Sequence, residues 1–385
     1  MKRIRMRKDL LISANARPMV GGQGLNLYHT VEALRPIFDV QVYCSGLYAG
    51  VPTTVIPGSG LGAFMQNTRG IRRYCDWQTF VTDAHFDREV SRLLKPAKIF
   101  HGVTYHCKRS LEAAGANRSF RVLDVITPHI DEYYRHQYRE CRAFGVRAPA
   151  NRMFVNRIRQ EYERADVIRV MSRYALESFL ERGFSTDKVK VIAPPFQVDE
   201  FPVADFSGPT FKVIFVGMVV PWKGFHHLIT AFQQARLKDS ELIIWGGPGS
   251  RSISRYLETQ QSRSPNIHVK PVSIREVGNQ EVYGTANVFV LPSLSDGFGY
   301  VVAEAMASGL PVIVTSNTGA ADLVRDGENG YIITAGDTEA LASRLTHLAQ
   351  HPALVREMGK KARESAATLS FDRFRAEYSE LVAAA

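Results

Sequence analysis

The sequence predicts an α/β protein built from two doubly wound parallel sheets in tandem, and three observations support this fold class. The chain has 385 residues, more than one hydrophobic core normally serves. Each half alternates short β-branched runs with amphipathic stretches, which is the pattern of parallel βαβ units. Between the halves lies PPFQVDEFPVADFSGPT, residues 194–210, a segment rich in Pro, Asp and Ser without periodicity. This segment is the best linker candidate, so we expect one domain over 1–203 and a second over 204–369.

The expected strands are short runs, and those of the second half are apolar throughout, as strands covered by helices on both faces should be. In the first half they are Leu10–Ser13, Val40–Cys44, Thr54–Ile56, Lys98–Val103, Arg121–Ile126, Val167–Met171 and Lys190–Ala193. In the second half they are Lys212–Val216, Glu241–Trp245, Asn266–Lys270, Val288–Leu291, Pro311–Thr315 and Tyr331–Thr334. Helices are expected notably at Leu25–Leu34, Asp83–Leu94, Asn151–Arg164 and, at the end of the chain, Phe371–Leu381. Two such sheets leave a cleft at the carboxyl ends of their strands, where ligands of open α/β sheets bind.

The composition is that of a globular protein, with 45% apolar and 22% charged residues. No run approaches the ~18 apolar residues of a membrane span. The apolar stretch Leu10–Ala14 is too short for a signal-peptide core, so we expect the protein to stay in the cytoplasm, where it is made. The four cysteines form no CxxC pair and are expected to be reduced structural thiols: Cys44, Cys75, Cys107 and Cys141.

Positive charge is concentrated in the first half of the chain. Residues 1–200 carry 31 Lys and Arg against 20 Asp and Glu, whereas residues 201–385 carry 17 against 18. A basic half suits an anionic acceptor, peripheral contact with an anionic membrane face, or nucleic acid, and a solvated Arg-rich surface explains it equally well. The excess is spread out and no nucleic-acid-binding module accompanies it, so nucleic acid is not expected as a partner.

The segment from Leu291 to Ile333 carries the most informative motif. A strand ends at Leu291, a loop with Gly297 and Gly299 follows, and a helix is expected to begin near Tyr300. The glycines let the backbone approach a ligand closely, and the helix N-terminus favours a phosphate. Asp296 and Glu304 are expected to point into one pocket, where carboxylates would accept hydrogen bonds from sugar hydroxyls. Asp296 alone would also suit a helix cap, and a glycine-rich loop alone is weak support.

A second loop strengthens the interpretation. The strand that ends at Val216 leads to Lys223 and Gly224 at the start of an amphipathic helix. A lysine there opposes the helix dipole, which makes sense if an anion sits at the helix tip. For an isolated lysine, a side chain reaching to solvent would be the better interpretation. A third loop, which contains Gly247, follows the next strand and is expected to line the same cleft.

These motifs resemble those of the retaining glycosyltransferases of family four, which have the GT-B fold. The family signature is an acid, Gly-Phe-Gly, a Glu eight positions after the acid, and then Ala-Met-Ala-x-Gly-x-Pro-Val-Ile. Here the segment 296–313 reads DGFGYVVAEAMASGLPVI. Gly217, Lys223 and Gly224 match the second motif, and Gly21-Gly22 resembles the family's glycine loop facing the donor. The resemblance covers nearly the whole chain, and it implies that residues 370–385 cross back to the first domain.

The resemblance implies a nucleotide-sugar donor site. Glu304 would hold the ribose hydroxyls, Asp296 would contact the transferred sugar, and Lys223 would neutralise the leaving diphosphate. The base would lie near Val272 and Ser273. The donor-binding set is Gly22, Lys223, Gly247, Val272, Ser273, Asp296, Gly297, Phe298, Gly299, Tyr300 and Glu304.

The resemblance also implies a reaction centre made by His129, Lys223 and Asp296, with His101 and His106 competing for the histidine role. A lone histidine after a strand is, however, more often a structural hydrogen-bonding residue. The implied reaction transfers a hexose with retention of configuration, and needs neither cofactor nor metal, because the lysine and helix N-termini stabilise the diphosphate. No Asp-x-Asp motif indicates a metal either.

Three positions depart from the family pattern. The family usually has Glu where this chain has Asp296, and often Arg where this chain has Met218, so one diphosphate cation is missing unless Arg251 replaces it. Gly319-Ala320 stands in place of Gly-Gly, with Asp322 in the following acidic position.

Other functions remain open at this stage. A dinucleotide-dependent dehydrogenase is disfavoured because the third glycine of the fingerprint would fall at Leu27. A nucleotide-sugar epimerase or hydrolase of the same fold, or a non-catalytic nucleotide-sugar-binding subunit, fits the same motifs. The acceptor, whether a sugar, a lipid-linked or a small molecule, would be selected by loops at Ser45–Phe80 and His129–Ala150.

Overall fold

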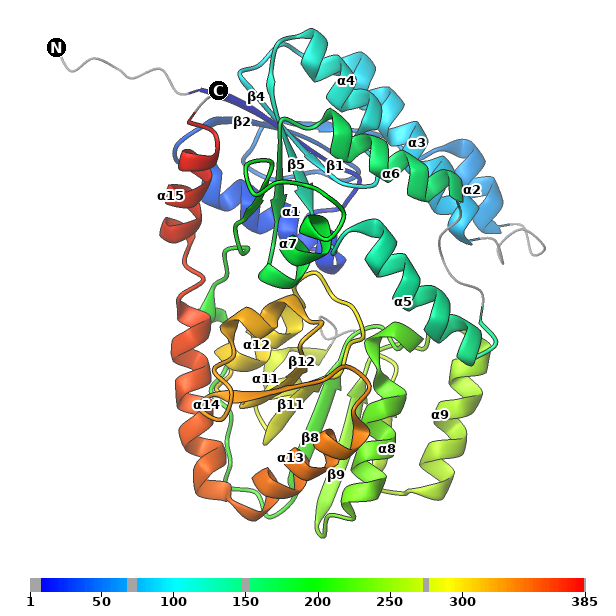
Figure 1. The fold of residues 1–385 in the computed structure, drawn as a ribbon, viewed down its shortest axis with the longest axis vertical. Coiled ribbons are helices and arrows are strands. Elements are labelled where there is room, and N and C mark those ends of the chain that lie inside the picture. The colour runs from blue at the N-terminus through cyan, green and yellow to red at the C-terminus, as the bar shows by residue number, and fades with distance from the viewer. Residues whose placement is uncertain (1–7, 68–74, 147–151, 273–276, 384–385) are drawn as a thin grey trace, which may run out of the picture.

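The computed structural model describes residues 8–67, 75–146, 152–272 and 277–383, and within them the chain forms two parallel sheets with helices on their faces (Figure 1). One sheet has seven strands and the other has six. This confirms the predicted fold class.

The first sheet has the strand order β3-β2-β1-β4-β5-β6-β7, and every pairing in it is parallel. Its strands are β1 (Asp9–Ala14), β2 (Asp39–Cys44), β3 (Thr53–Val55), β4 (Ile99–Val103), β5 (Phe120–Val125), β6 (Val167–Val170) and β7 (Val189–Val191). The helices of this half are α1 (Gly21–Leu34), α2 (Gly60–Asn67), α3 (Cys75–Leu93), α4 (Lys108–Ala116), α5 (Ile130–Ala143), α6 (Arg152–Arg164) and α7 (Arg173–Leu180). Strands β4 and β6 are buried along their whole length because helices cover both faces of the sheet.

The second sheet has the order β10-β9-β8-β11-β12-β13 and is also parallel. Its strands are β8 (Phe211–Val216), β9 (Ser240–Trp245), β10 (Ile267–Lys270), β11 (Val288–Leu291), β12 (Val312–Thr315) and β13 (Gly330–Ile333). Its helices are α8 (Phe225–Ala235), α9 (Arg251–Arg263), α11 (Asn279–Tyr283), α12 (Tyr300–Ala307), α13 (Thr338–Gln350) and α14 (Pro352–Ala367), with the 3-10 turns η1 (Val198–Glu200), η2 (Pro221–Lys223) and η3 (Gly319–Leu323). None of the helices in the described ranges is long and apolar enough to cross a membrane.

The last helix, α15 (Phe371–Leu381), returns to the first half of the molecule. Figure 1 shows it beside the seven-stranded sheet, above α14. Phe374 and Tyr378 are fully buried in the same apolar cluster as residues of β1 and β2, and the Arg169 guanidinium lies 5.0 Å from the centre of the Phe374 ring. The C-terminus of the chain therefore completes the core of the N-terminal half.

Helix α5 connects the two halves in a way that the sequence did not indicate. We expected residues 129–150 to form an acceptor loop, but residues 130–143 are a helix that reaches from the first sheet to the helices of the second (Figure 1). Phe144 at its end packs against Phe225 and Tyr256, with ring centres 5.6 and 5.5 Å away. The prediction of a loop was wrong for residues 130–143 because the buried face of this helix is largely polar, with Glu132, Gln137 and Glu140 among its buried residues.

Candidate functional site

Lys223 and Asp296 form an ion pair at the carboxyl ends of two neighbouring strands. Strand β8 leads through η2 to Lys223, and β11 leads to the loop that holds Asp296. The lysine Nζ donates to Oδ2 of the aspartate, and the two side chains are 24% and 14% exposed. The sequence assigned both residues to one cleft, and the structure brings them into direct contact.

Backbone contacts hold each of the two loops in place. The Asp296 N–H donates to the Asn317 carbonyl and the Gly319 N–H donates to the Asp296 carbonyl, both at 2.9 Å. Gly224 has a φ of 71°, and a Cβ there would collide with the Pro292 carbonyl at the end of β11. The lysine loop therefore lies directly against the aspartate loop only because a glycine follows the lysine.

The environment of the pair keeps Lys223 charged. Burial lowers the pKa of Lys223, but the charge of Asp296 and the hydrogen bond with it outweigh burial and raise the pKa above its usual value. Tyr133 comes from α5, and burial raises its pKa while Lys223 and hydrogen bonds with Gln137 and Trp222 lower it. Tyr133 is thus a site residue from the N-terminal half that sequence reasoning missed. Its place in the run DEYYR, just after His129, was the only signal for it.

The N-terminus of α12 lies beside this pair, because a Cβ on its N-cap residue Gly299 would be 3.5 Å from Oδ2 of Asp296. Tyr300 opens α12, and its hydroxyl donates to Oδ1 of Asn26 in α1 at 3.1 Å. Neither helix has a side-chain cap or an acidic residue in its first turn. The first N–H groups of both helices are therefore left without a side-chain acceptor, and the dipole of each helix favours an anion at its own N-terminus.

Asn26 belongs to a buried polar network in the N-terminal half. Its side-chain amide donates to Oδ2 of Asp124 at 2.7 Å, and Arg169 donates to the other oxygen of that carboxylate at 2.8 Å. Burial raises the pKa of Asp124, but Arg169 and His101 outweigh burial and bring it to about 2. His101 also contacts the hydroxyl of Tyr378, 3.0 Å away. The network fixes the position of Asn26, and through it the hydroxyl of Tyr300.

The Asp296 loop is seated directly on the N-terminal half. Gly297 is buried, and a Cβ there would collide with the carbonyl of Ile126 and lie 2.6 Å from Cα of Thr127. Ser172 donates to the Gly297 carbonyl at 2.8 Å, and the hydroxyls of Tyr174 and Ser295 are 3.0 Å apart. The cleft wall is therefore built from both halves, and these N-terminal contacts were not predicted.

Phe298 and Gly299 shape the turn that enters α12. Phe298 is 2% exposed and anchors the loop in the core. Gly299 is the N-cap of the helix with a φ of 84°, a conformation that favours glycine. Asp322 is the acid that follows Gly319-Ala320, where the chain departs from the family pattern. Its carboxylate accepts a hydrogen bond of 2.7 Å from the Arg173 N–H, so a residue of the C-terminal half caps α7 of the N-terminal half.

His129 lies at the start of α5 with its side chain turned into the N-terminal half. It is the N-cap residue, its Nδ1 accepts from the Asp131 N–H at 3.3 Å, and it is 4% exposed. The rings of Tyr162 and Phe179 lie 5.1 and 4.9 Å from it. Burial lowers its pKa to about 4. These contacts give His129 a structural role, whereas its role at the reaction centre stays a prediction.

Glu304 contacts helix α11. The Tyr283 hydroxyl donates to its Oε2 at 2.6 Å, so the carboxylate lies on the α11 side of α12. Asp296 lies in the loop before α12 and Glu304 in the second turn of that helix, which suits separate hydroxyl partners along an extended ligand.

The remaining predicted donor residues lie on exposed loops. Gly22 is exposed in the first turn of α1, with nothing within 4 Å of a Cβ placed on it. Gly247 is exposed, and its carbonyl accepts from the Val219 N–H at 3.0 Å, which ties the third loop to the second. Val272 is 37% exposed after β10, and Ser273 lies outside the described residues.

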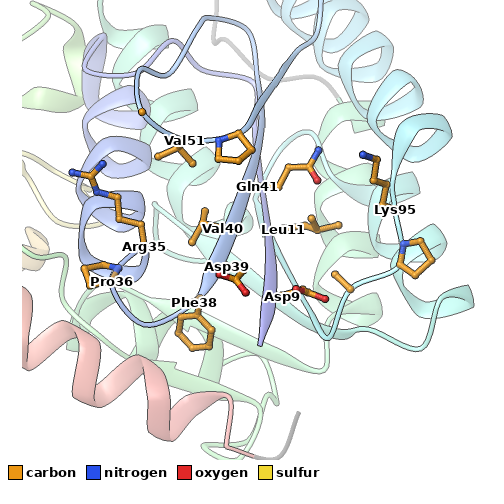
Figure 2. A pocket seen from close by; sticks show the side chains of 14 residues that line it. Asp9, Leu11, Arg35, Pro36, Phe38, Asp39, Val40, Gln41, Val51 and Lys95 are labelled. Atoms are coloured by element: carbon orange, nitrogen blue, oxygen red, sulfur yellow. The ribbon is translucent and has the colours of Figure 1, made fainter. Parts of the chain in front are cut away.

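A separate groove of about 660 Å³ opens at the opposite edge of the first sheet. Figure 2 shows its lining, with Asp9 and Asp39 at the amino ends of β1 and β2, and Arg35 and Lys95 at its sides. Because the ion pair lies at carboxyl strand ends, this groove is not the site that the sequence predicted.

The two facing α/β halves, with glycine-rich loops at their carboxyl edges, define a protein of the GT-B class. Residues 198–365 match the family model of the glycosyl transferases group 1. The capsular polysaccharide biosynthesis glycosyltransferase CapM of Staphylococcus aureus is 36% identical over 160 residues, which are 40% of this chain and 40% of CapM. The alpha-maltose-1-phosphate synthase of Mycolicibacterium smegmatis is 23% identical over 93% of this chain and 94% of the relative. The C-terminal half of the chain is therefore similar to the group 1 glycosyltransferases.

Solved structures agree with this fold over almost the whole chain. Sucrose-phosphate synthase from Thermosynechococcus elongatus has a TM-score of 0.74 at 20% identity and covers 98% of this chain and 100% of that chain. HepE from Anabaena in complex with UDP-glucose has a TM-score of 0.74 at 18% identity, with the same coverage. The alignment with CapM spans only about two fifths of that relative, so donor and acceptor have to be argued from the site itself.

Proposed function

We propose that the protein transfers a hexose from a nucleotide sugar, with uridine diphosphate as the leaving group, to an acceptor hydroxyl. The observation that carries this proposal is the charged Lys223 next to Asp296, beside the uncapped N-terminus of α12. A lysine beside a helix N-terminus suits a diphosphate. The complex of HepE with UDP-glucose supports the choice of base, and we assign the chain to family four of the glycosyltransferases.

In this mechanism, Lys223 and Asp296 form their ion pair while the site contains no donor. When the donor binds, Lys223 moves from Asp296 to the diphosphate, and the released carboxylate accepts hydrogen bonds from the sugar hydroxyls. Glu304 holds the ribose hydroxyls on the α11 side of the same helix. The backbone N–H groups of Gly299 and Tyr300 lie at the N-terminus of α12 and complete the phosphate site.

Configuration is retained in the proposed reaction because the acceptor arrives on the face from which the diphosphate leaves. A double displacement would need a carboxylate free to attack the anomeric carbon. In the proposed complex Asp296 accepts hydrogen bonds from the sugar hydroxyls and Glu304 holds the ribose, so neither acid serves as that nucleophile. The lysine and the N-terminus of α12 supply the stabilising charge, and the reaction therefore uses no metal.

A thermal-shift panel with UDP-, ADP- and GDP-sugars on the full chain tests the donor. We expect UDP-sugars to raise the melting temperature most, and the best donor is then incubated with candidate sugar and lipid-linked acceptors. Transfer with release of UDP supports the proposal, whereas no stabilisation by any nucleotide sugar contradicts it.

The same experiment separates the alternatives. Release of an epimer or of free sugar without acceptor would indicate an epimerase or hydrolase. Tight donor binding without transfer to any acceptor would indicate a binding subunit. We place the protein in the cytoplasm, with peripheral contact between its basic N-terminal half and an anionic membrane face, and sedimentation with anionic vesicles tests that contact.

A further inference from the structure

A second cluster of polar side chains joins the two halves, separate from the Lys223–Asp296 pair. It contains Glu140, near the end of α5, and His226 and His227, in the first turn of α8. One ligand atom from each of the three side chains lies within 4.8 Å of the others. Glu140 is buried and the two histidines are partly buried, so the cluster is not a solvated surface group.

Two imidazoles and one carboxylate are a donor set that Zn²⁺ takes with three protein ligands and a water. We propose that the protein binds one Zn²⁺ ion at Glu140, His226 and His227, and that this ion bridges the two halves of the molecule. The carboxylate comes from the N-terminal half and both imidazoles come from the C-terminal half. The ion therefore binds tightly only when the halves are in contact.

The contacts of the side chains fit a metal ligand set. Arg139 Nε donates to Oε1 of Glu140 at 2.9 Å and orients the carboxylate, as residues behind a metal ligand commonly do. The other oxygen, Oε2, lies 3.5 Å from Nε2 of His226. Within the described part of the chain, the buried Nδ1 of His226 has no hydrogen-bond partner, so protein contacts leave one nitrogen of this imidazole unsatisfied.

The packing around the cluster holds the ligands in position. The Phe144 ring lies 4.9 Å from His226 and 5.6 Å from Phe225, which fixes the end of α5 on the start of α8. The His226 and His227 rings are 4.1 Å apart, centre to centre. Small side-chain rotations are then enough to reach zinc–nitrogen distances of about 2.0–2.1 Å.

The cluster lies next to the loop that holds Lys223, so an ion bound there would also stabilise that loop. Lys223 stands three residues before His226, on the turn that leads into α8. A bridging ion at His226 holds this turn against α5, which also carries Tyr133. The ion acts as a clamp between the halves and takes no part in the chemistry at the diphosphate.

Isothermal titration of the full chain with ZnCl₂ tests the proposal without any measurement of activity. His347 and His351 form another histidine pair, with ring centres 4.4 Å apart, so the titration is made in a His347→Gln, His351→Gln background. We expect one equivalent of Zn²⁺ to bind, a rise in melting temperature, and a smaller radius of gyration in solution scattering. Absence of saturable binding in this background overturns the proposal.

Glu140→Gln and His227→Gln are the decisive variants, because they remove ligands from opposite halves. Loss of a residue that only orients a ligand typically weakens metal binding about 10–100-fold, and loss of a ligand should weaken it at least as much. Both variants should therefore lose the binding step and the Zn²⁺-dependent rise in melting temperature. If Glu140→Gln binds Zn²⁺ as tightly as the parent, the ion sits on the histidines alone and the bridge is refuted. His227→Gln gives a second result should Glu140→Gln fail to fold.

Discussion

The hydroxyl of Tyr300 donates a hydrogen bond of 3.1 Å to Oδ1 of Asn26, and this contact joins helix α12 of the C-terminal half to helix α1 of the N-terminal half. The two residues are 274 positions apart in the sequence. Asn26 is itself held by Asp124 in the core of the N-terminal half. This hydroxyl is therefore one of the contacts that set the relative position of α1 and α12, together with the packing of the His29 ring against the Tyr300 ring.

Tyr300→Phe removes that hydroxyl and keeps the ring. A hydrogen bond contributes about 0.5–1.5 kcal/mol net, so we expect donor affinity to fall about 2- to 10-fold. The melting temperature should change little, because the ring remains packed 5.4 Å from Phe298. Isothermal titration with the donor measures the change. Unchanged donor affinity would show that the bond does not set the position of the phosphate site.

Lys223→Ala should abolish most of the turnover without unfolding the protein. Removing one preorganised charge-stabilising group typically lowers kcat about 10²–10³-fold, and Lys223 is the cation next to the leaving group in our mechanism. Steady-state kinetics and circular dichroism measure the two effects. Lys238→Ala, at an exposed lysine of the same half, is the matched control and should behave as the wild type. Wild-type kinetics in Lys223→Ala would remove the basis of the diphosphate site.

The strands could be predicted closely from the sequence, and there is a physical reason for this. Parallel strands covered on both faces by helices are continuous apolar runs, and such runs stand out in a single sequence. Val288–Leu291 was predicted with the bounds that β11 has, and Glu241–Trp245 differs from β9 by one residue. Once the strand ends were predicted, the loops that follow them could be located as well, so Lys223 and Asp296 could be assigned to one cleft.

The contacts between the halves could not be predicted in the same way. Periodicity shows which face of a helix is buried, but it does not name the partner of that face. Asn26 and Tyr300 meet only because of the relative position of two complete domains. In helix α5 the buried face is not apolar. It carries Glu132, which pairs with Arg182, and Glu140, which contacts His226, so the pattern of apolar residues does not show that this face is buried.

Gly297→Ala should disturb the contact between the halves while each half stays folded. The added methyl would collide with backbone atoms of Ile126 and Thr127, which cannot rotate away as a side chain can. We expect weaker donor binding and a turnover reduced about 10-fold or more, since small misplacements at a reaction centre are costly. Gly58→Ala is the control, because nothing lies within 4 Å of a Cβ there. Equal kinetics of the two variants would show that the close contact of Gly297 with Ile126 and Thr127 is not needed for transfer.

Asp124→Asn should strongly destabilise the N-terminal half. Asp124 and Arg169 are both fully buried and 2.8 Å apart, and breaking a buried ion pair from one side costs about 3–5 kcal/mol. The pKa of about 2 means that this stability is present above pH 4 and is lost as the pH falls through 2. Urea denaturation at neutral pH measures the change. Glu112→Gln, in the exposed pair with Arg164, should cost no more than about 1 kcal/mol, and equal losses would contradict the prediction.

His129→Asn tests the structural role of the histidine through the pH dependence of stability. Asparagine also caps helices well, so the variant keeps a cap for α5 but has no group that titrates. The pKa of His129 is about 4 in the folded protein, below its usual value of about 6.5. The unfolded chain therefore binds the proton first. Wild-type stability should fall relative to the variant, by up to about 3 kcal/mol, as the pH drops from 6.5 towards 4.

Urea denaturation of both proteins at several pH values measures this difference, and the other histidines cancel because both proteins contain them. Parallel stability curves would contradict the buried, neutral state of His129. Transfer assays on the same variant address its predicted place at the reaction centre. A turnover close to that of the wild type would leave His129 with the capping role alone, because asparagine cannot replace an imidazole that takes part in the reaction.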